Sequence, residues 1–224
     1  MIYCTMSIGK YHSEKYSNDI NRLATKHKVE VLTDCPEYFK NCTIHEYSRD
    51  VFSYYEKLPF MLSVILNNKD RVLYFDSDTI NEIENSEYNF DEKSVYTYKL
   101  YPMSTYFIKY GREKALEILT KDSGIIVLLD ILDELGYDMC DYLHERILSI
   151  PYSNKIKKVK EEILELQNIF EEKHPKNKDW SKASRKNLQR YSKVGCGYGE
   201  GGALSVVLTN HKFKFKELNE KNPI

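Results

Sequence analysis

The feature that most constrains the fold is a short apolar run, Val72-Leu-Tyr-Phe75, which ends at the acidic triplet Asp76-Ser77-Asp78. A run of this length and composition is typical of a buried strand. Carboxylates at the carboxyl end of such a strand project into the crevice where open α/β sheets bind their ligands. The run therefore predicts an α/β fold with a ligand site immediately after Phe75.

The residues before this run alternate between strand and helix patterns. We predict strands at 2–6, 29–33 and 43–47. One helix begins near Ser13 and places Tyr16, Ile20, Leu23 and Ala24 on one face; a second spans about 54–66, with Pro59 in its first turn. This order predicts a mostly parallel central sheet, Rossmann-like in the N-terminal half.

The second half of the chain is predicted to be mainly helical. We expect short strands at 94–98, 105–108 and 212–215, with helical segments at 115–119, 125–135, 142–148, 156–170 and 203–208. The segment 156–170 is amphipathic and is expected to pack on its own domain or against a partner helix. A glycine-rich run, 195–202, precedes the last helical segment. No linker separates two domains, so one domain over 1–224 is predicted.

Composition excludes several classes of protein. Lys and Arg number 33 against 34 Asp and Glu, which argues against a dedicated nucleic-acid binder. The longest apolar stretch, Gly124 to Leu132, contains Asp130 and is too short to span a membrane. The first residues lack the pattern of a signal peptide. Five cysteines without a C-x-x-C pair predict buried thiols in a reducing compartment. A soluble cytoplasmic protein is expected.

The acidic triplet is the part of the sequence that indicates chemistry. If the chain turns as it leaves the strand, the Asp76 and Asp78 carboxylates converge, and a cation between them relieves their repulsion. Oxygen ligands of this kind suit Mg²⁺ or Mn²⁺, which take further ligands from water and a substrate's phosphates. The structural alternative is a turn in which one Asp caps the backbone and the other faces solvent.

The segment Arg71–Ile80 resembles the D-x-D segment of GT-A-fold glycosyltransferases, most closely that of the glycogenin-like group. Ser53–Leu58 is similar to that group's helix bearing a basic residue. Glu200–Ser205 and Phe215–Asn219 are similar to its later acidic segment and the strand that follows. The resemblance implies a GT-A-like fold. It also implies Mn²⁺- or Mg²⁺-dependent transfer of a sugar from a nucleotide diphosphate sugar, UDP favoured, to a carbohydrate or other hydroxyl acceptor.

The same resemblance implies roles for individual residues. Asp78 would bind the metal and Asp76 the metal, the ribose or both, with Ser77 beneath the ribose. Lys57 would neutralise phosphate or sugar charge. Glu200 would face the donor sugar and acceptor as a base, as a hydrogen-bond acceptor, or as a neighbour of a helix N-cap. The nucleobase pocket would be formed by Thr5, Ile8, Gly9 and Tyr11. Residues 1–100 would be the nucleotide-sugar-binding half and 101–224 the acceptor-side half.

Other readings of the same residues remain open. The family's Asn/Ala-Gly strand and its C-terminal His-x-x-Gly segment are not recognisable, so the acceptor and the stereochemical outcome are left open. A haloacid-dehalogenase-like phosphatase would use Asp76 as nucleophile and Asp78 as acid/base. A nucleotidyltransferase would use both acids for metal, and a non-catalytic module would bind the nucleotide sugar without turnover. The sequence leaves the sugar, the base and the oligomeric state undetermined.

Overall fold

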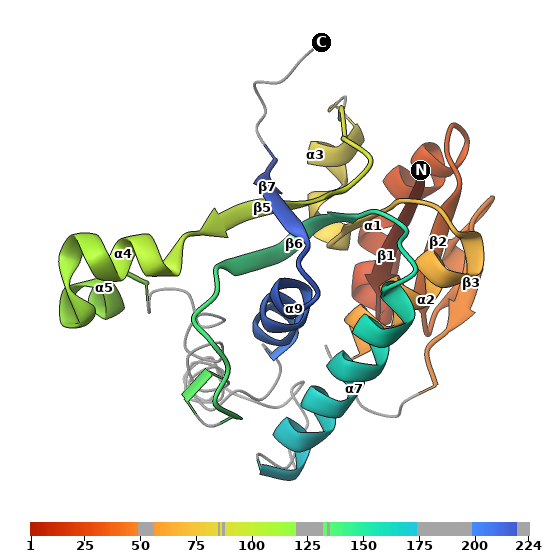
Figure 1. Ribbon diagram of the computed structural model, residues 1–224. Helices are drawn as coiled ribbons and strands as arrows, with labels where there is room; N and C mark the ends of the chain where they lie inside the picture. Colours follow the sequence, from red (N-terminus) through yellow and green to blue (C-terminus); the bar gives the residue numbers. More distant parts are fainter. Residues whose placement is uncertain are drawn as a thin grey trace.

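The structure, a computed structural model, describes residues 1–48, 56–84, 86, 88–119, 132, 133, 135–173 and 199–218 (Figure 1). The elements of the first half are β1 (Ile2–Ser7), α1 (Lys10–Ala24), β2 (Val29–Thr33), the 3-10 turn η1 (Pro36–Tyr38), β3 (Thr43–Glu46), α2 (Lys57–Asn68), β4 (Val72–Phe75), the 3-10 turn η3 (Ser77–Thr79) and α3 (Ile80–Glu84). Those of the second half are β5 (Ser94–Tyr101), α4 (Met103–Tyr110), α5 (Arg112–Leu119), β6 (Tyr142–Ile150), α7 (Ile156–Lys173), α9 (Gly199–Asn210) and β7 (Lys214–Glu217).

All the strands belong to one mixed sheet with the order β3-β2-β1-β4-β6-β5-β7. The strands β1 to β4 run parallel to one another, β6 runs antiparallel to both β4 and β5, and β7 runs parallel to β5. The predicted α/β class with a mostly parallel central sheet is confirmed. From β1, the strands β2 and β3 are added on one side and β4 is added on the other. The boundary between β1 and β4 is therefore a topological switch point.

Helices cover both faces of the sheet. On one face, Ile20 of α1 and Ile83 of α3 pack with Leu73 and Phe75 of β4. On the other face, the helices α2, α7 and α9 pack on a larger core that includes Cys4 of β1 and Tyr74 of β4 (Figure 1). The side chains of β4 therefore alternate between two apolar layers, which explains why its sequence is apolar without interruption.

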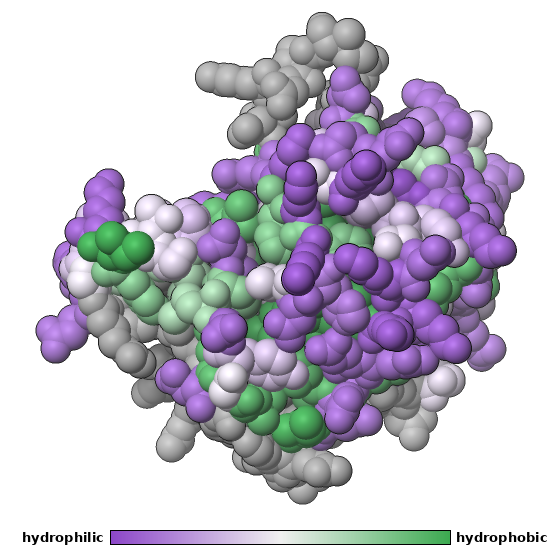
Figure 2. Space-filling view, in the orientation of Figure 1, coloured by the Kyte–Doolittle hydropathy of each residue, from purple (hydrophilic) through white to green (hydrophobic). Residues whose placement is uncertain are grey.

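The long helix α7 packs on its own domain, as the amphipathic pattern predicted. Ile156, Val159, Ile163 and Leu166 are buried in the core shared with α2 and α9, whereas Lys157, Lys158, Glu161 and Glu165 are exposed. Figure 2 shows polar side chains over much of the molecular face shown, with apolar side chains also at the end where α4 and α5 extend from the sheet.

Two predicted segments of the second half are wrong. Residues 105–108 lie inside α4, which begins after Pro102 and ends at Gly111 with φ of 73°, so the helix signals at its two ends outweigh the short β-like run between them. Residues 142–148, predicted as helix, form most of strand β6. That strand lies between β4 and β5 in the sheet, and most of its side chains are buried. Its sequence therefore lacks the alternation of a half-exposed strand.

Two further predictions concern the ends of helices. The predicted helix 125–135 falls mostly outside the described residues. Of the glycine-rich run 195–202, residues 199–202 are the first turn of α9, so this helix begins earlier than the predicted residue 203. Residues 195–198 lie outside the described part of the chain. Within the described ranges, no helix combines the length and apolar character needed to cross a membrane.

Candidate functional site

The carboxyl ends of β1, β2 and β4 meet at one edge of the sheet, and the chain turns there with polar groups. After β1, Gly9 takes φ of 86° and its N–H donates a hydrogen bond to Asp34 Oδ1 at 2.8 Å. Asp34 directly follows β2, and Asp76 directly follows β4. Glycine tolerates this positive φ, which lets the chain turn sharply from β1 into α1. The edge at the β1/β4 switch point thus carries two carboxylates and a backbone turn.

Asp76 is held by three groups. Its backbone N–H donates to the Arg146 carbonyl of β6 at 2.9 Å. Its Oδ1 accepts hydrogen bonds from Lys57 Nζ at 3.0 Å and from the Tyr74 hydroxyl at 3.0 Å. The Lys57 ammonium also lies 4.7 Å from the centre of the Tyr74 ring. Two residues singled out separately in the sequence, Lys57 and Asp76, are therefore brought together by α2 and β4.

The exposure of this ion pair is unequal. Lys57 is 3% exposed, and its position in the first turn of α2 places it in the core beneath the sheet edge. The side chain of Asp76 is 36% exposed. A buried ammonium is stabilised by a carboxylate whose other oxygen can still reach solvent or a ligand. The pair presents negative charge at the surface with a positive charge directly below it.

The turn η3 separates the two acids. Thr79 donates from both its N–H and its hydroxyl to the Asp76 carbonyl, at 2.8 Å and 2.7 Å, which closes the turn. Ser77 is buried inside this turn and Asp78 is exposed. The turn is closed by the main-chain carbonyl of Asp76, and its carboxylate makes no capping hydrogen bond among the described residues, so the side-chain cap of the structural alternative does not form at Asp76. The turn also leaves the Asp78 carboxylate open to solvent at the edge that carries Asp76.

The four residues of the expected nucleobase pocket differ in their surroundings. Thr5 is fully buried in β1, and its hydroxyl has no hydrogen-bond partner in the part of the chain that the structure describes. Ile8 packs against the core beneath α2, and Gly9 forms the turn. Tyr11 lies in the first turn of α1 and is 68% exposed, with Lys15 Nζ 5.6 Å from its ring centre. Of these, Tyr11 presents an open aromatic surface at the edge.

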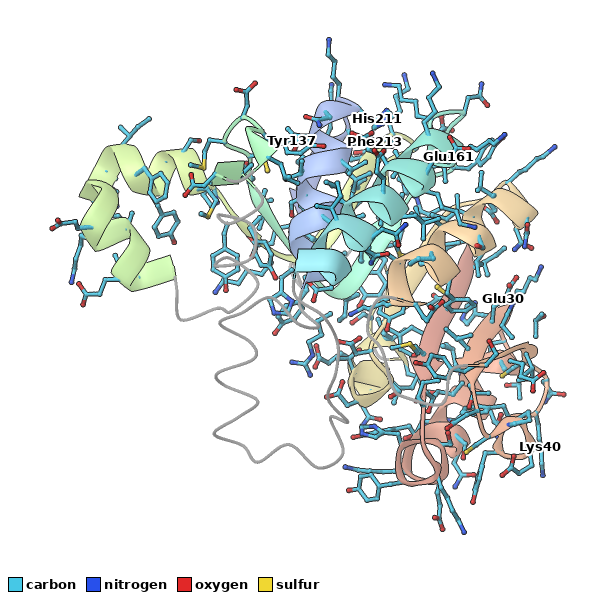
Figure 3. The ribbon with its side chains drawn as sticks, turned by 90° about the horizontal axis from the view of Figure 1, so that it is seen from below. Glu30, Lys40, Tyr137, Glu161, His211 and Phe213 are labelled. Carbon is cyan, nitrogen blue, oxygen red and sulfur yellow. The ribbon has the colours of Figure 1, made fainter. Side chains whose placement is uncertain are left out.

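Glu200 lies in the first turn of α9, whose next residue, Gly201, is buried against β6. His211 lies beyond the opposite end of the same helix. Its Nε2 is 2.7 Å from Glu162 Oε2 of α7, so it has a structural role there. In Figure 3, His211 and Phe213 lie beside Glu161, at the opposite end of the molecule from Lys40.

Two acidic residues at or near this edge were missed by the sequence analysis. Asp34 was read only as the end of a strand, yet it occupies the same position after β2 that Asp76 occupies after β4. Glu145 was hidden because its segment was predicted as helix; it lies in β6, is 9% exposed, and accepts a hydrogen bond from the Tyr142 hydroxyl at 3.4 Å. An acid directly after a predicted strand was the available signal for Asp34.

Cys4 lies close to this charged group and is uncharged. Burial raises the pKa of the Cys4 thiol well above its usual range, Glu30 adds to the rise, and Lys57 opposes it. A neutral thiol adds no negative charge beside Lys57. Cys4, Cys35, Cys42 and Cys140 are all free cysteines. Cys4 and Cys140 are buried, as predicted, whereas Cys35 and Cys42 are only half-buried, and Cys196 lies outside the described residues.

A divalent metal at this edge would have oxygen ligands from Asp76 and Asp78. Among the described residues, no three His, Cys, Asp or Glu side chains lie close enough together to hold a metal. A protein site with one or two carboxylates, completed by water and substrate phosphates, is the usual arrangement for Mg²⁺. The donor atoms present therefore fit a metal that is bound together with a phosphorylated ligand.

Comparisons with known proteins give little beyond this geometry. No family model matches the chain, and no curated protein matches it. A solved structure that matches is the glycosyltransferase GlyE of Streptococcus pneumoniae TIGR4, with 11% identity and a TM-score of 0.43. The match covers 98% of this chain and 45% of that one, so the chain spans less than half of its length.

Proposed function

We propose that this protein is a metal-dependent glycosyltransferase that moves a sugar from a nucleotide diphosphate sugar, a UDP-sugar favoured, to a hydroxyl of a carbohydrate or similar acceptor. The observation that carries the proposal is the Lys57–Asp76 pair beside the exposed Asp78, at the switch point between β1 and β4. Ligands of open α/β sheets bind at such points. The charges there suit a diphosphate bound with a divalent cation.

The chemistry assigns separate tasks to these residues. In the transfer, the bond between the anomeric carbon and the diphosphate oxygen breaks. A new bond forms to the acceptor oxygen, and the acceptor's proton passes to a base. Negative charge accumulates on the departing diphosphate. Lys57 would stabilise that charge from below, and Asp76 and Asp78 would hold Mn²⁺ or Mg²⁺, which supplies Lewis-acid stabilisation of the leaving diphosphate when bound.

The remaining predicted residues are assigned the roles that the resemblance implies. Gly9 and Tyr11 lie at the end of β1 and the start of α1, where an aromatic ring can stack on a nucleobase. Thr5 and Ile8 would form the inner wall of that pocket, and Ser77 would lie beneath the ribose. Glu200, in the first turn of α9, would face the acceptor side as the base or as a hydrogen-bond acceptor for sugar hydroxyls.

A thermal-shift panel of nucleotide sugars, with Mn²⁺ or with EDTA, tests the class and identifies the donor. We expect one or more UDP-sugars to raise the melting temperature only when Mn²⁺ is present, and the matching nucleoside diphosphate to be released when an acceptor is added. Release of phosphate from small phosphoesters without stabilisation by any nucleotide sugar would contradict the proposal and favour the phosphatase. Binding of a nucleotide sugar without turnover on any acceptor would reduce the protein to a binding module.

A further inference from the structure

Glu145 is a buried acid whose hydrogen bonding is incomplete. It is 9% exposed in the middle of β6, and within the described residues its one hydrogen-bond partner is the Tyr142 hydroxyl at 3.4 Å. Among the described residues, the Lys57 ammonium pairs with Asp76 and the Arg146 guanidinium pairs with Glu82 of α3 at 3.2 Å. Burying a carboxylate costs free energy unless hydrogen bonds or a cation compensate it. A side chain in this state is ready to accept hydrogen bonds from a ligand.

Glu145 belongs to the same edge as Asp76. The Asp76 N–H donates to the carbonyl of Arg146, so Glu145 lies one residue from the position of β6 that faces Asp76. The Asp76 carboxylate contacts Lys57 of α2, and the Glu145 carboxylate lies against Gly201 of α9. Both helices pack on the same face of the sheet. The two carboxylates therefore lie on one side of the sheet.

Gly201 is what allows the Glu145 carboxylate to lie against α9. A Cβ at position 201 would come within 2.4 Å of Glu145 Oε2 and within 2.8 Å of the Tyr142 hydroxyl. The Ser205 hydroxyl fixes this contact, because it donates to the Gly201 carbonyl at 2.6 Å and accepts from the Leu143 N–H at 2.9 Å. The carboxylate is thus placed beside the first turn of a helix, where the positive end of the dipole favours negative charge.

We propose that Glu145 binds hydroxyl groups of the sugar carried by the donor, an inference that rests on the function proposed above. A carboxylate accepts hydrogen bonds from neutral hydroxyls, whereas it repels a diphosphate. Lys57 and the exposed Asp78 serve the diphosphate, and Glu145, one strand farther along, serves the sugar. Gly201 keeps the space between β6 and α9 that this carboxylate occupies.

The test compares Glu145→Gln with Glu82→Gln, the same change in an exposed acid that pairs with Arg146 next to Glu145. Calorimetry with Mn²⁺ measures the affinity for UDP and for the UDP-sugar selected by the panel. We expect Glu145→Gln to weaken the UDP-sugar about tenfold or more and to leave UDP unchanged, because the lost hydrogen bonds involve a charged acceptor. Glu82→Gln should leave the affinities for both ligands unchanged.

A second readout separates sugar binding from a structural role. UDP-sugars that lack one hydroxyl are titrated into wild type and Glu145→Gln. If Glu145 binds that hydroxyl, the deoxy sugar binds the wild type more weakly than the complete sugar does. The Glu145→Gln variant, which has already lost this hydrogen bond, should bind the two sugars almost equally. Equal losses for UDP and UDP-sugar, additive losses for every deoxy sugar, or no loss would overturn the role of Glu145. A wild type that binds neither UDP nor any nucleotide sugar would instead overturn the proposed function itself.

Discussion

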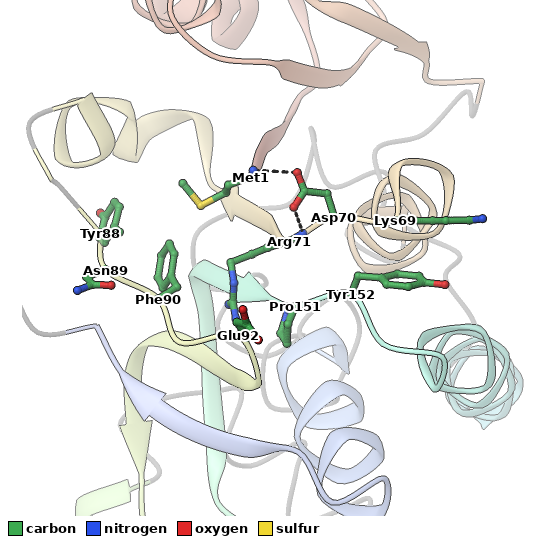
Figure 4. Close-up of a pocket in the computed structure, with 10 residues that line it drawn as sticks. All are labelled: Met1, Lys69, Asp70, Arg71, Tyr88, Asn89, Phe90, Glu92, Pro151 and Tyr152. Atoms are coloured by element: carbon green, nitrogen blue, oxygen red, sulfur yellow. Dashed lines mark hydrogen bonds and ion pairs between the residues drawn. The ribbon is translucent and has the colours of Figure 1, made fainter.

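The two ends of the parallel strands differ in how their charges are satisfied. At the amino end, a hollow of about 450 Å³ is lined by residues that include Met1, Asp70, Arg71 and Tyr152 (Figure 4). There the N-terminal ammonium pairs with Asp70 at 2.8 Å, and Arg71 donates to the Ser94 carbonyl and the Ser149 hydroxyl. At the carboxyl end, Asp78 is open to solvent, and the Glu145 carboxylate has one long hydrogen bond within the described part of the chain.

This difference shows that a hollow by itself does not identify a functional site. The guanidinium of Arg71 lies at the amino end but uses its donors to join β4 to β5 and β6, and it lies 5.1 Å from the centre of the Phe90 ring. Such a group stabilises the fold and has little capacity left for a ligand. The carboxyl end holds acids whose bonding a ligand would complete, which is the usual condition of a binding site. Changes at the carboxyl end should therefore weaken ligand binding, whereas changes at the amino end should lower stability and leave binding unchanged.

The largest effect on binding is expected for Asp78→Asn. Asp78 is exposed, so we expect the melting temperature to change little, whereas Mn²⁺-dependent affinity for the nucleotide sugar should fall about 100-fold or more. Calorimetry in Mn²⁺ and in EDTA, on wild type and variant, measures this. If the Asp78→Asn variant keeps the affinity and the metal dependence of the wild type, Asp78 is not part of the binding site.

Lys57→Ala should affect both binding and stability. The change removes the positive charge below the diphosphate, and donor affinity should fall about tenfold. It also leaves Asp76 without its cation and a space in the core, so the unfolding free energy should fall by about 1–3 kcal/mol. Denaturant melts and calorimetry measure the two effects, with Lys158→Ala on the exposed face of α7 as control. A loss of stability with unchanged donor affinity would restrict Lys57 to a structural role.

Arg71→Ala is the matching change at the amino end. It removes hydrogen bonds to the Ser94 carbonyl and the Ser149 hydroxyl, and we expect the unfolding free energy to fall by about 2 kcal/mol. Affinity for the nucleotide sugar, measured at a temperature where the variant is folded, should equal that of wild type. If the folded variant has a reduced affinity, the ligand binds near the hollow of Figure 4 and not at the carboxyl end.

The smallest effect is a pH dependence at the start of β5. The hydrogen bond from Lys216 and those from the backbone N–H groups of Lys93 and Ser94 hold the pKa of Asp91 well below its usual range. The native state therefore binds fewer protons there than the unfolded state. The stabilisation is present above pH of about 4 and is lost as the pH falls below it. Wild type should be more stable than Asp91→Asn at pH 6, and this difference should shrink in acid; a difference that stays constant in denaturant melts down to pH 2.5 would contradict this.

The sequence predicted the first half better than the second for a physical reason. Val72–Phe75 and Val29–Thr33 are short, apolar and separated by well-marked helices, and parallel pairing follows from that order. Residues 142–148 pair with β4 and β5 along both edges, and most of their side chains are buried, so their pattern lacks the alternation of a half-exposed strand. Tertiary contacts that the local sequence does not encode decided that segment.

The same reason explains which site residues were found. Asp76, Asp78 and Lys57 follow or begin elements with strong local signals, and Lys57 and Asp76 do meet at the β4 edge. Glu145 could not be found while its strand was read as helix, and its contact with Gly201 depends on how α9 packs on β6. From the sequence, Gly201 belonged only to a glycine-rich run before the last helical segment. The structure shows it in close approach to the protein's own carboxylate.

The central claim is that Asp76 and Asp78 hold a divalent ion together with a diphosphate. Electron paramagnetic resonance of free Mn²⁺, titrated with protein in the presence of UDP, tests it most directly. We predict that the wild type removes more of the free Mn²⁺ signal than UDP alone removes, and that Asp78→Asn loses this additional effect. A wild type that adds nothing to the binding of Mn²⁺ by UDP, or an Asp78→Asn variant that behaves as the wild type does, would contradict the claim.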